Sequence, residues 1–183
     1  INESNVVLFF GLIRDYKGLD SLILSMEKVF EKNKNIKLLI AGECYGNKEK
    51  YNSMIQASKY SDKIFWKEKY IDEREVGIYF SASDVVVLPY ISASQSGIIP
   101  LSYHYNKPVI TSDLDGLREV VDIGKTGYVF DPRLKGALSN SILDFFKNYD
   151  ENYYKSNIEL YKKNFAWSNF EDSILCLLDR LSS

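Results

Sequence analysis

Short apolar runs alternate with amphipathic helical segments along this chain, and this alternation is the feature that most constrains its fold. Residues 6–10 form a continuous apolar run that ends at Gly11, which is typical of a strand buried on both faces. In the next segment, apolar residues recur at helical spacing between charged ones: Leu19, Leu22, Ile23, Met26, Val29 and Phe30. Residues 36–41 repeat the apolar run and end at Gly42. The pattern predicts parallel strands joined by crossover helices.

The same rhythm continues to residue 130. Further strands are expected at residues 63–66, 84–89, 108–111 and 127–130, and helices at residues 48–60, 72–82, 98–105 and 117–121. Pro89 ends the fourth strand, whereas Pro100 falls early in a helix, where its missing N–H is tolerated. Six parallel strands with crossover helices indicate an α/β fold with a Rossmann-like, doubly wound sheet.

Residues 133–183 carry helical patterns and no further strand. One helix is expected from Leu134 to Tyr149 and a last one from Trp167 to Leu181, while the Tyr-, Lys- and Asn-rich residues 147–164 are either a hinge region or a solvated helix pair. We expect one domain over residues 1–183, with a Rossmann-like core at 1–132 and helices at 133–183. These helices would pack on the core.

Composition excludes several classes of protein. With 45% hydrophobic residues, 26% charged residues and a net charge of −2, the 183 residues are neither disordered nor basic enough to indicate nucleic-acid binding. Two cysteines and a single histidine provide neither a disulfide framework nor a metal-ligand cluster, so no metal is expected. No apolar run approaches a membrane span and no leader is visible. A cytoplasmic compartment is expected, and because the chain begins without methionine we expect a domain excised from a longer chain whose partner lies upstream.

In open α/β sheets, ligands bind beyond the carboxyl ends of the strands, so the loops there are the candidate sites. The first such loop contains Gly11, Arg14 and Lys17 between a strand and a helix. Arginine offers a planar fork of donors and lysine a point charge, a combination that suits a diphosphate. The alternative is that both are solvent-exposed loop cations.

The second candidate loop precedes the helix predicted at residues 98–105. It is rich in small polar residues and consists of Ser94, Gln95, Ser96 and Gly97, followed by Ile98. Free backbone N–H groups at a helix start can bind phosphate without any side-chain charge. The alternative is a plain serine N-cap.

A third loop, residues 112–119, presents polar groups at the same sheet edge. Asp115 and Gly116 lie in it, and Glu119 is expected early in the short helix that follows. Glu119 either accepts a hydrogen bond from a ligand hydroxyl or favours the helix dipole. His104 lies between two tyrosines of a helix, which fits a packed or surface histidine better than a catalytic one.

Together these segments resemble the C-terminal, donor-binding domain of the retaining family-four (group 1) glycosyltransferases with the GT-B fold. The resemblance extends over almost the whole chain and is carried by residues 9–20, 38–42, 79–90, 107–112, 116–121 and 124–132. It implies binding of a nucleoside-diphosphate sugar, built on UDP or GDP, with no metal or other cofactor. The implied acceptor is a saccharide or a lipid-linked molecule, bound with the help of the missing N-terminal domain.

The resemblance also implies roles for individual residues. Positions matching Arg14 and Lys17 are catalytic in the family because they grip the diphosphate and relieve charge on the leaving group. The loop matching Ser94–Gly97 binds the phosphates and faces the donor sugar, and the loop matching Asp113–Glu119 lies nearby. Polysaccharide biosynthesis and a cytoplasmic location, with peripheral contact at the inner membrane face as an option, follow from the same resemblance.

One departure from the family pattern is clear. The usual Glu-x7-Glu motif is missing, because an ungapped count back from Pro108 places Leu101 and Ala93 at the two glutamate positions. Gln95 and the adjacent serines are candidates to contact the sugar instead. Asp115-Gly116 replaces the Gly-Gly pair often found before the Glu119 helix.

Two other functions remain open at this point. A degenerate, non-catalytic scaffold would explain the missing glutamates, although a scaffold has no need of Arg14 and Lys17. Half of a nucleotide-sugar epimerase would need additional acid–base groups, and the loops at the strand ends contain no histidine.

Overall fold

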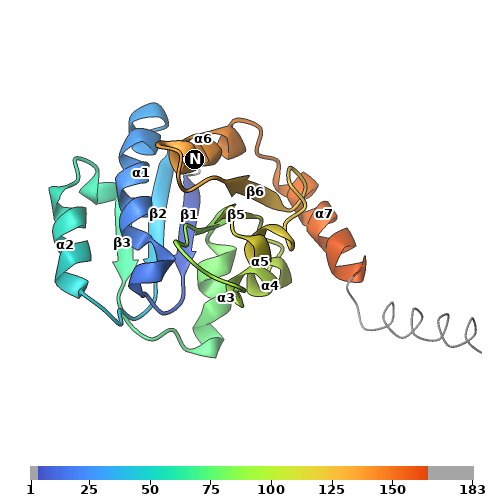
Figure 1. Ribbon diagram of the computed structural model, residues 1–183, viewed down its shortest axis with the longest axis horizontal. Coiled ribbons are helices and arrows are strands. Elements are labelled where there is room, and N and C mark those ends of the chain that lie inside the picture. The colour runs from blue at the N-terminus through green and yellow to red at the C-terminus, as the bar shows by residue number, and fades with distance from the viewer. Residues whose placement is uncertain (1–3, 165–183) are drawn as a thin grey trace, which may run out of the picture.

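The structure is a computed structural model of the chain, and it describes residues 4–164. Six parallel strands form one sheet in the order β3-β2-β1-β4-β5-β6, as Figure 1 shows. The strands are β1 (Asn5–Phe10), β2 (Ile36–Ala41), β3 (Ile64–Lys67), β4 (Val85–Leu88), β5 (Val109–Ser112) and β6 (Gly127–Phe130). The predicted Rossmann-like sheet is therefore confirmed.

Helices cover both faces of this sheet and bury its apolar strands. One core cluster joins the sheet to α1 (Leu19–Lys32), α2 (Lys48–Ala57) and α6 (Ala137–Lys147), and α1 and α6 lie side by side in Figure 1. The other cluster joins it to α3 (Glu73–Ser81), α4 (Ile98–His104), α5 (Asp115–Arg118) and α7 (Glu151–Asn164). Burial of apolar side chains on both faces explains why the strands are continuous apolar runs in the sequence.

The order of the strands fixes where a ligand site can form. β1 pairs with β2 on one side and with β4 on the other, so the chain winds outward in opposite directions from the gap between β1 and β4. Such a reversal leaves a crevice beyond the carboxyl ends of the two strands. The loops that follow β1 and β4 are the first and second candidate loops.

Several predicted boundaries are wrong by a few residues. The helix expected at residues 48–60 ends at Ala57, and a short 3₁₀ turn, η2 (Ser61–Lys63), precedes β3. β4 is shorter than residues 84–89, because the Asp84 carboxylate accepts a hydrogen bond from Val6 N–H at 2.6 Å and Pro89 ends the strand. α6 begins at Ala137 rather than near Leu134, after Gly136 with its φ of 79°.

The segment expected to be a hinge or a solvated helix pair is neither. Residues 151–164 form the single helix α7, whose Tyr154 and Ile158 are buried. The Lys162 Nζ also donates to the Asn106 side chain at 2.6 Å, which ties α7 to the end of α4. The helix predicted at residues 167–181 lies outside the described residues.

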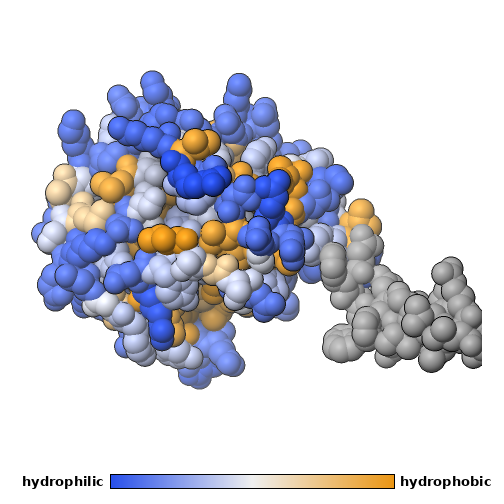
Figure 2. All heavy atoms as spheres, in the orientation of Figure 1, coloured by the Kyte–Doolittle hydropathy of each residue, from blue (hydrophilic) through white to orange (hydrophobic). Residues whose placement is uncertain are grey.

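The surface visible in Figure 2 is mainly hydrophilic, with apolar patches between the polar residues. Within residues 4–164, no helix combines the length and the apolar character that crossing a membrane requires.

Candidate functional site

The loop after β1 is held against the end of β4 by close backbone contact. Gly18 has a φ of 67°, and a Cβ at this position would lie 2.0 Å from the Pro89 carbonyl oxygen. Ile91 N–H donates to the Tyr16 carbonyl at 2.7 Å, which joins the same two loops. Only glycine fits at position 18, and the two candidate loops therefore form one continuous wall at the crevice.

Lys17 lies inside this wall. Its side chain is only 8% exposed, and Nζ lies 5.7 Å from the centroid of the Tyr90 ring. Nζ is also 3.4 Å from the place that a Cβ on Gly11 would occupy, so the glycine leaves room for the ammonium group. Burial lowers the pKa of Lys17, and the charge of Arg14 lowers it further.

Arg14 is exposed beside the buried lysine. Its guanidinium lies 5.8 Å from the centroid of the Tyr45 ring, which follows β2. Among residues 4–164, neither Arg14 nor Lys17 forms an ion pair with a carboxylate. Two unpaired cations near one another, one of them desolvated, form a site for an anion.

The loop after β4 supplies unoccupied backbone donors next to these cations. Ser96 Oγ accepts the N–H of Ile98 at 3.2 Å, so this serine binds one of the N–H groups at the helix start, as a capping serine does. Within residues 4–164, however, the N–H groups of Gln95, Ser96 and Gly97 have no partner. The Ile98 side chain reaches to 3.3 Å from the Cβ position of Gly11, which brings this loop to the lysine.

The third candidate loop closes against the second. A Cβ on Gly116 would lie 1.6 Å from the Ser94 carbonyl oxygen, so these two backbones touch. Between the loops is a pocket of about 370 Å³, whose wall includes Ser94, Gln95, Ser96, Gly97, Gly116 and Glu119. Asp115 does not line this pocket but faces a neighbouring hollow of about 680 Å³. The sequence-predicted residues of loops two and three thus gather in adjoining cavities.

The structure corrects the position of Glu119. The short helix α5 begins at Asp115 rather than at Leu117, and Glu119 is its C-cap. A carboxylate at the C-terminal end of a helix gains nothing from the helix dipole, so that alternative is wrong for Glu119. Its carboxylate has no hydrogen-bond partner among residues 4–164.

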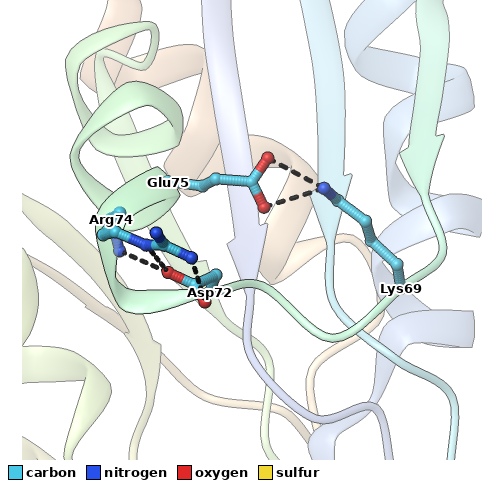
Figure 3. Close-up of polar contacts among 4 residues, drawn as sticks. All are labelled: Lys69, Asp72, Arg74 and Glu75. Carbon is cyan, nitrogen blue, oxygen red and sulfur yellow. Dashed lines mark hydrogen bonds and ion pairs between the residues drawn. The ribbon is translucent and has the colours of Figure 1, made fainter.

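The charged side chains of the loop after β3 and of the start of α3 pair with one another, so their charges are not available to a ligand. Lys69 Nζ contacts both carboxylate oxygens of Glu75 at 2.8 and 2.7 Å, and Arg74 pairs with Asp72, the N-cap of α3 (Figure 3). The side chains of this segment hold the start of α3 in place.

Sequence reasoning missed the aromatic residues that surround the cations. Tyr16 packs edge-on against Tyr90 with 5.9 Å between the ring centroids, and Tyr45 faces Arg14. These residues belong to different loops, so no spacing in the sequence reveals that they meet. His104 is exposed at the end of α4 with its ring against Tyr105, outside the cavities described above.

No group of three or more His, Cys, Asp or Glu side chains in the described part of the chain is placed to hold a metal ion. The donors at the crevice are cations and amides, which suit anions rather than metals.

The doubly wound sheet, with its crevice at the strand-order reversal, defines the class of this chain as a Rossmann-like α/β domain. The family model of the glycosyl transferases group 1 matches residues 1–163. The chain belongs to this family, and its fold is one half of the GT-B fold.

The chain is also similar to three known proteins. It is 28% identical over 127 residues to D-inositol 3-phosphate glycosyltransferase of Pseudarthrobacter chlorophenolicus, covering 68% of this chain and 30% of the relative. It is 25% identical over 181 residues to phosphatidyl-myo-inositol mannosyltransferase of Mycobacterium leprae, covering 97% and 47%. The crystal structure of Anabaena Alr3699/HepE in complex with UDP and glucose has a TM-score of 0.77 at 17% identity, covering 97% and 48%. The chain therefore spans less than half of each.

Proposed function

We propose that this chain is the donor-binding half of an enzyme that transfers a sugar from a nucleoside-diphosphate sugar to a saccharide or lipid-linked acceptor. The observation that carries this function is the pair of cations, Arg14 and Lys17, at the gap between β1 and β4, which form no ion pair with a carboxylate of residues 4–164. A diphosphate supplies the negative charge that both lack. Burial of Lys17 strengthens its interaction with that charge, because less water screens it.

The reaction gives these cations a catalytic role. The acceptor hydroxyl oxygen forms a bond to the anomeric carbon of the donor, the bond from that carbon to the β-phosphate oxygen breaks, and the hydroxyl proton is released. The departing nucleoside diphosphate keeps the electron pair of the broken bond. Arg14 and Lys17 stabilise the charge that develops on it, so they act where negative charge increases in the transition state.

The pocket beside α4 is the proposed position of the donor sugar. Gln95 and Glu119 line it from two different loops, and together they offer an amide donor, an amide acceptor and a carboxylate to sugar hydroxyls. Residues 95–97 also line this pocket, and their backbone amides suit the phosphates. In this arrangement Gln95 and Glu119 substitute for the two glutamates of the missing Glu-x7-Glu motif.

The names of the similar proteins support a nucleotide sugar as the donor, but they do not identify its base. The Anabaena structure contains UDP and glucose, whereas a mannosyltransferase of Xanthomonas campestris pv. campestris is named for GDP-mannose. We therefore include both UDP and GDP sugars in the proposal, with no metal required. A place in polysaccharide biosynthesis, in the cytoplasm or at the inner face of the membrane, belongs to the same proposal.

Calorimetric titration of the chain with UDP, GDP and their common sugar conjugates tests the function. One nucleotide should bind, and Arg14→Ala and Lys17→Ala should each weaken it by about 1.5–3 kcal/mol, as expected for charged hydrogen bonds. Lys155→Ala, which neutralises an exposed lysine of α7, is the matched control and should bind normally.

Two results would contradict the proposal. Normal nucleotide binding by both site variants would show that these two cations do not bind the nucleotide. Absence of binding at millimolar nucleotide, in this chain and after the upstream half is restored, would favour a scaffold domain without the family's glutamates.

A further inference from the structure

A groove leads away from the proposed sugar pocket across the ends of β5 and β6. The pocket shares Ser94 and Gly116 with the neighbouring hollow of about 680 Å³. That hollow shares Ile91, Leu114 and Asp115 with a third hollow of about 660 Å³, which reaches Arg133. The three cavities therefore adjoin one another around the start of α5, and the second and third together are the groove. Each has the size of a small-molecule site.

Fixed polar groups line the far part of this groove. One Nη of Arg118 lies 2.8 Å from both carboxylate oxygens of Asp113. Arg133 contacts Asp131 through Nε at 2.9 Å and through its second Nη at 2.8 Å. Each guanidinium keeps further N–H donors for a ligand, because these pairs use only part of its five. The carboxylates hold the arginines in place and offset their charge.

Apolar side chains lie between these polar groups. Ile91 is 64% exposed, and it lines both hollows together with the partly buried Leu114. Pro132 adds another apolar surface beside Arg133. Alternating apolar surface and directional donors and acceptors match a sugar ring, which presents C–H groups on its faces and hydroxyls at its edge. The balanced charge does not favour a strongly anionic ligand, and the charged walls do not favour a lipid chain.

We propose that this groove binds the acceptor as a saccharide, with Ile91 and Arg133 as specificity-determining contacts. The inference rests on the proposed function, because the position of the groove next to the sugar pocket is what makes the bound saccharide an acceptor. The reacting hydroxyl has to lie next to the donor's anomeric carbon, and a ligand in the first hollow is separated from the pocket only by Ser94 and Gly116. The acceptor is then held partly by the donor-binding half of the enzyme.

Saturation-transfer NMR on the chain with saturating UDP tests this site. The probes are maltotriose, mannotriose, chitotriose and a disaccharide of glucuronic acid and glucose. At least one should receive saturation, and Ile91→Ala and Arg133→Ala should each weaken its binding by roughly ten-fold, since each removes a contact group from an exposed position. The affinity for UDP, measured by calorimetry, should not change in either variant.

Arg74→Ala is the matched control. Arg74 pairs with Asp72 two residues before it through Nε at 2.8 Å, just as Arg133 pairs with Asp131, but it lies at the start of α3 and outside the groove. This variant should bind the saccharide like the wild type.

The outcomes separate the groove from the donor site. UDP binding without binding of any probe, or with unchanged probe binding in both groove variants, overturns the groove proposal and leaves the donor site standing. Where GDP rather than UDP binds in the calorimetric titration, GDP replaces UDP in these measurements. Failure of both UDP and GDP to bind overturns the donor site, and with it the acceptor assignment that depends on it.

Discussion

The backbone of Gly116 lies directly against that of Ser94, so that a Cβ on the glycine would come within 1.6 Å of the serine carbonyl oxygen. This contact joins the loops after β4 and β5 and shapes both the sugar pocket and the adjoining hollow. The Asp115-Gly116 sequence keeps the one glycine that this approach requires.

Gly116→Ala should therefore weaken binding of the nucleotide sugar more than binding of the nucleotide alone. The new methyl group has to push the Ser94 loop away from α5, which widens the sugar pocket and leaves the cations of the β1 loop in place. We expect a several-fold loss for the sugar conjugate by calorimetry. Gly46→Ala is the control, because the nearest atom to its Cβ position is 3.6 Å away. Equal losses for nucleotide and conjugate would contradict this interpretation.

Lys17→Met should stabilise the fold while it weakens nucleotide binding. The pKa of Lys17 is lowered in the folded state, so the unfolded chain binds more protons and the free energy of unfolding rises with pH between that lowered pKa and 10.5. At neutral pH the buried charge is therefore a cost to folding, and an apolar side chain of similar length removes it. Thermal unfolding at pH 7 measures the effect. A lower melting temperature for Lys17→Met than for the wild type would be the contrary result.

The affinity for UDP should fall as the pH rises through the pKa of Lys17, at a lower pH than for an ordinary lysine. Burial is the larger cause of this shift and the charge of Arg14 the smaller one. Arg14→Ala removes the second cause, so the fall in affinity should begin at a higher pH, although binding is weaker throughout. Calorimetry across alkaline pH measures the fall in affinity of the wild type and of Arg14→Ala. The control variant, Lys155→Ala, should lose affinity at the same pH as the wild type. A fall that begins at the same pH in Arg14→Ala would show that the two charges do not interact.

The sheet is predictable from the sequence because its strands are buried on both faces. Residues 6–10 and 36–41 are unbroken or nearly unbroken apolar runs, and the β1–β2 pairing is regular over six residues on each strand. The position of Lys17 and Arg14 after β1 also follows from the sequence, since a loop at the carboxyl end of a parallel strand has to lie at the ligand edge.

Contacts between loops are not predictable in the same way. At the start of α5, Gly116 meets the backbone of Ser94, and the aromatic ring beside Lys17 belongs to Tyr90 of another loop. Neither contact has a periodic signal, because each is made by residues far apart in the chain. The sequence pattern consequently puts Glu119 at the wrong end of its helix, and it contains no signal for the groove near Arg133.

The last prediction concerns the amino-terminal ends of the two central strands, where Asp84, just before β4, contacts the start of β1. Its carboxylate accepts the N–H of Val6 at 2.6 Å, and burial raises its pKa even though the Val6 bond and the charge of Lys107 act in the other direction. Asp84→Ala should destabilise the fold by about 1–3 kcal/mol, because the Val6 N–H loses its partner in a partly buried place. Asp84→Asn should cost less, since an amide oxygen still accepts that bond and no charge is buried. Urea unfolding at pH 7 compares the two, with exposed Glu73→Ala as the control; a loss in Asp84→Asn as large as that in Asp84→Ala would mean that the charge, rather than the bond to Val6, joins β1 to β4.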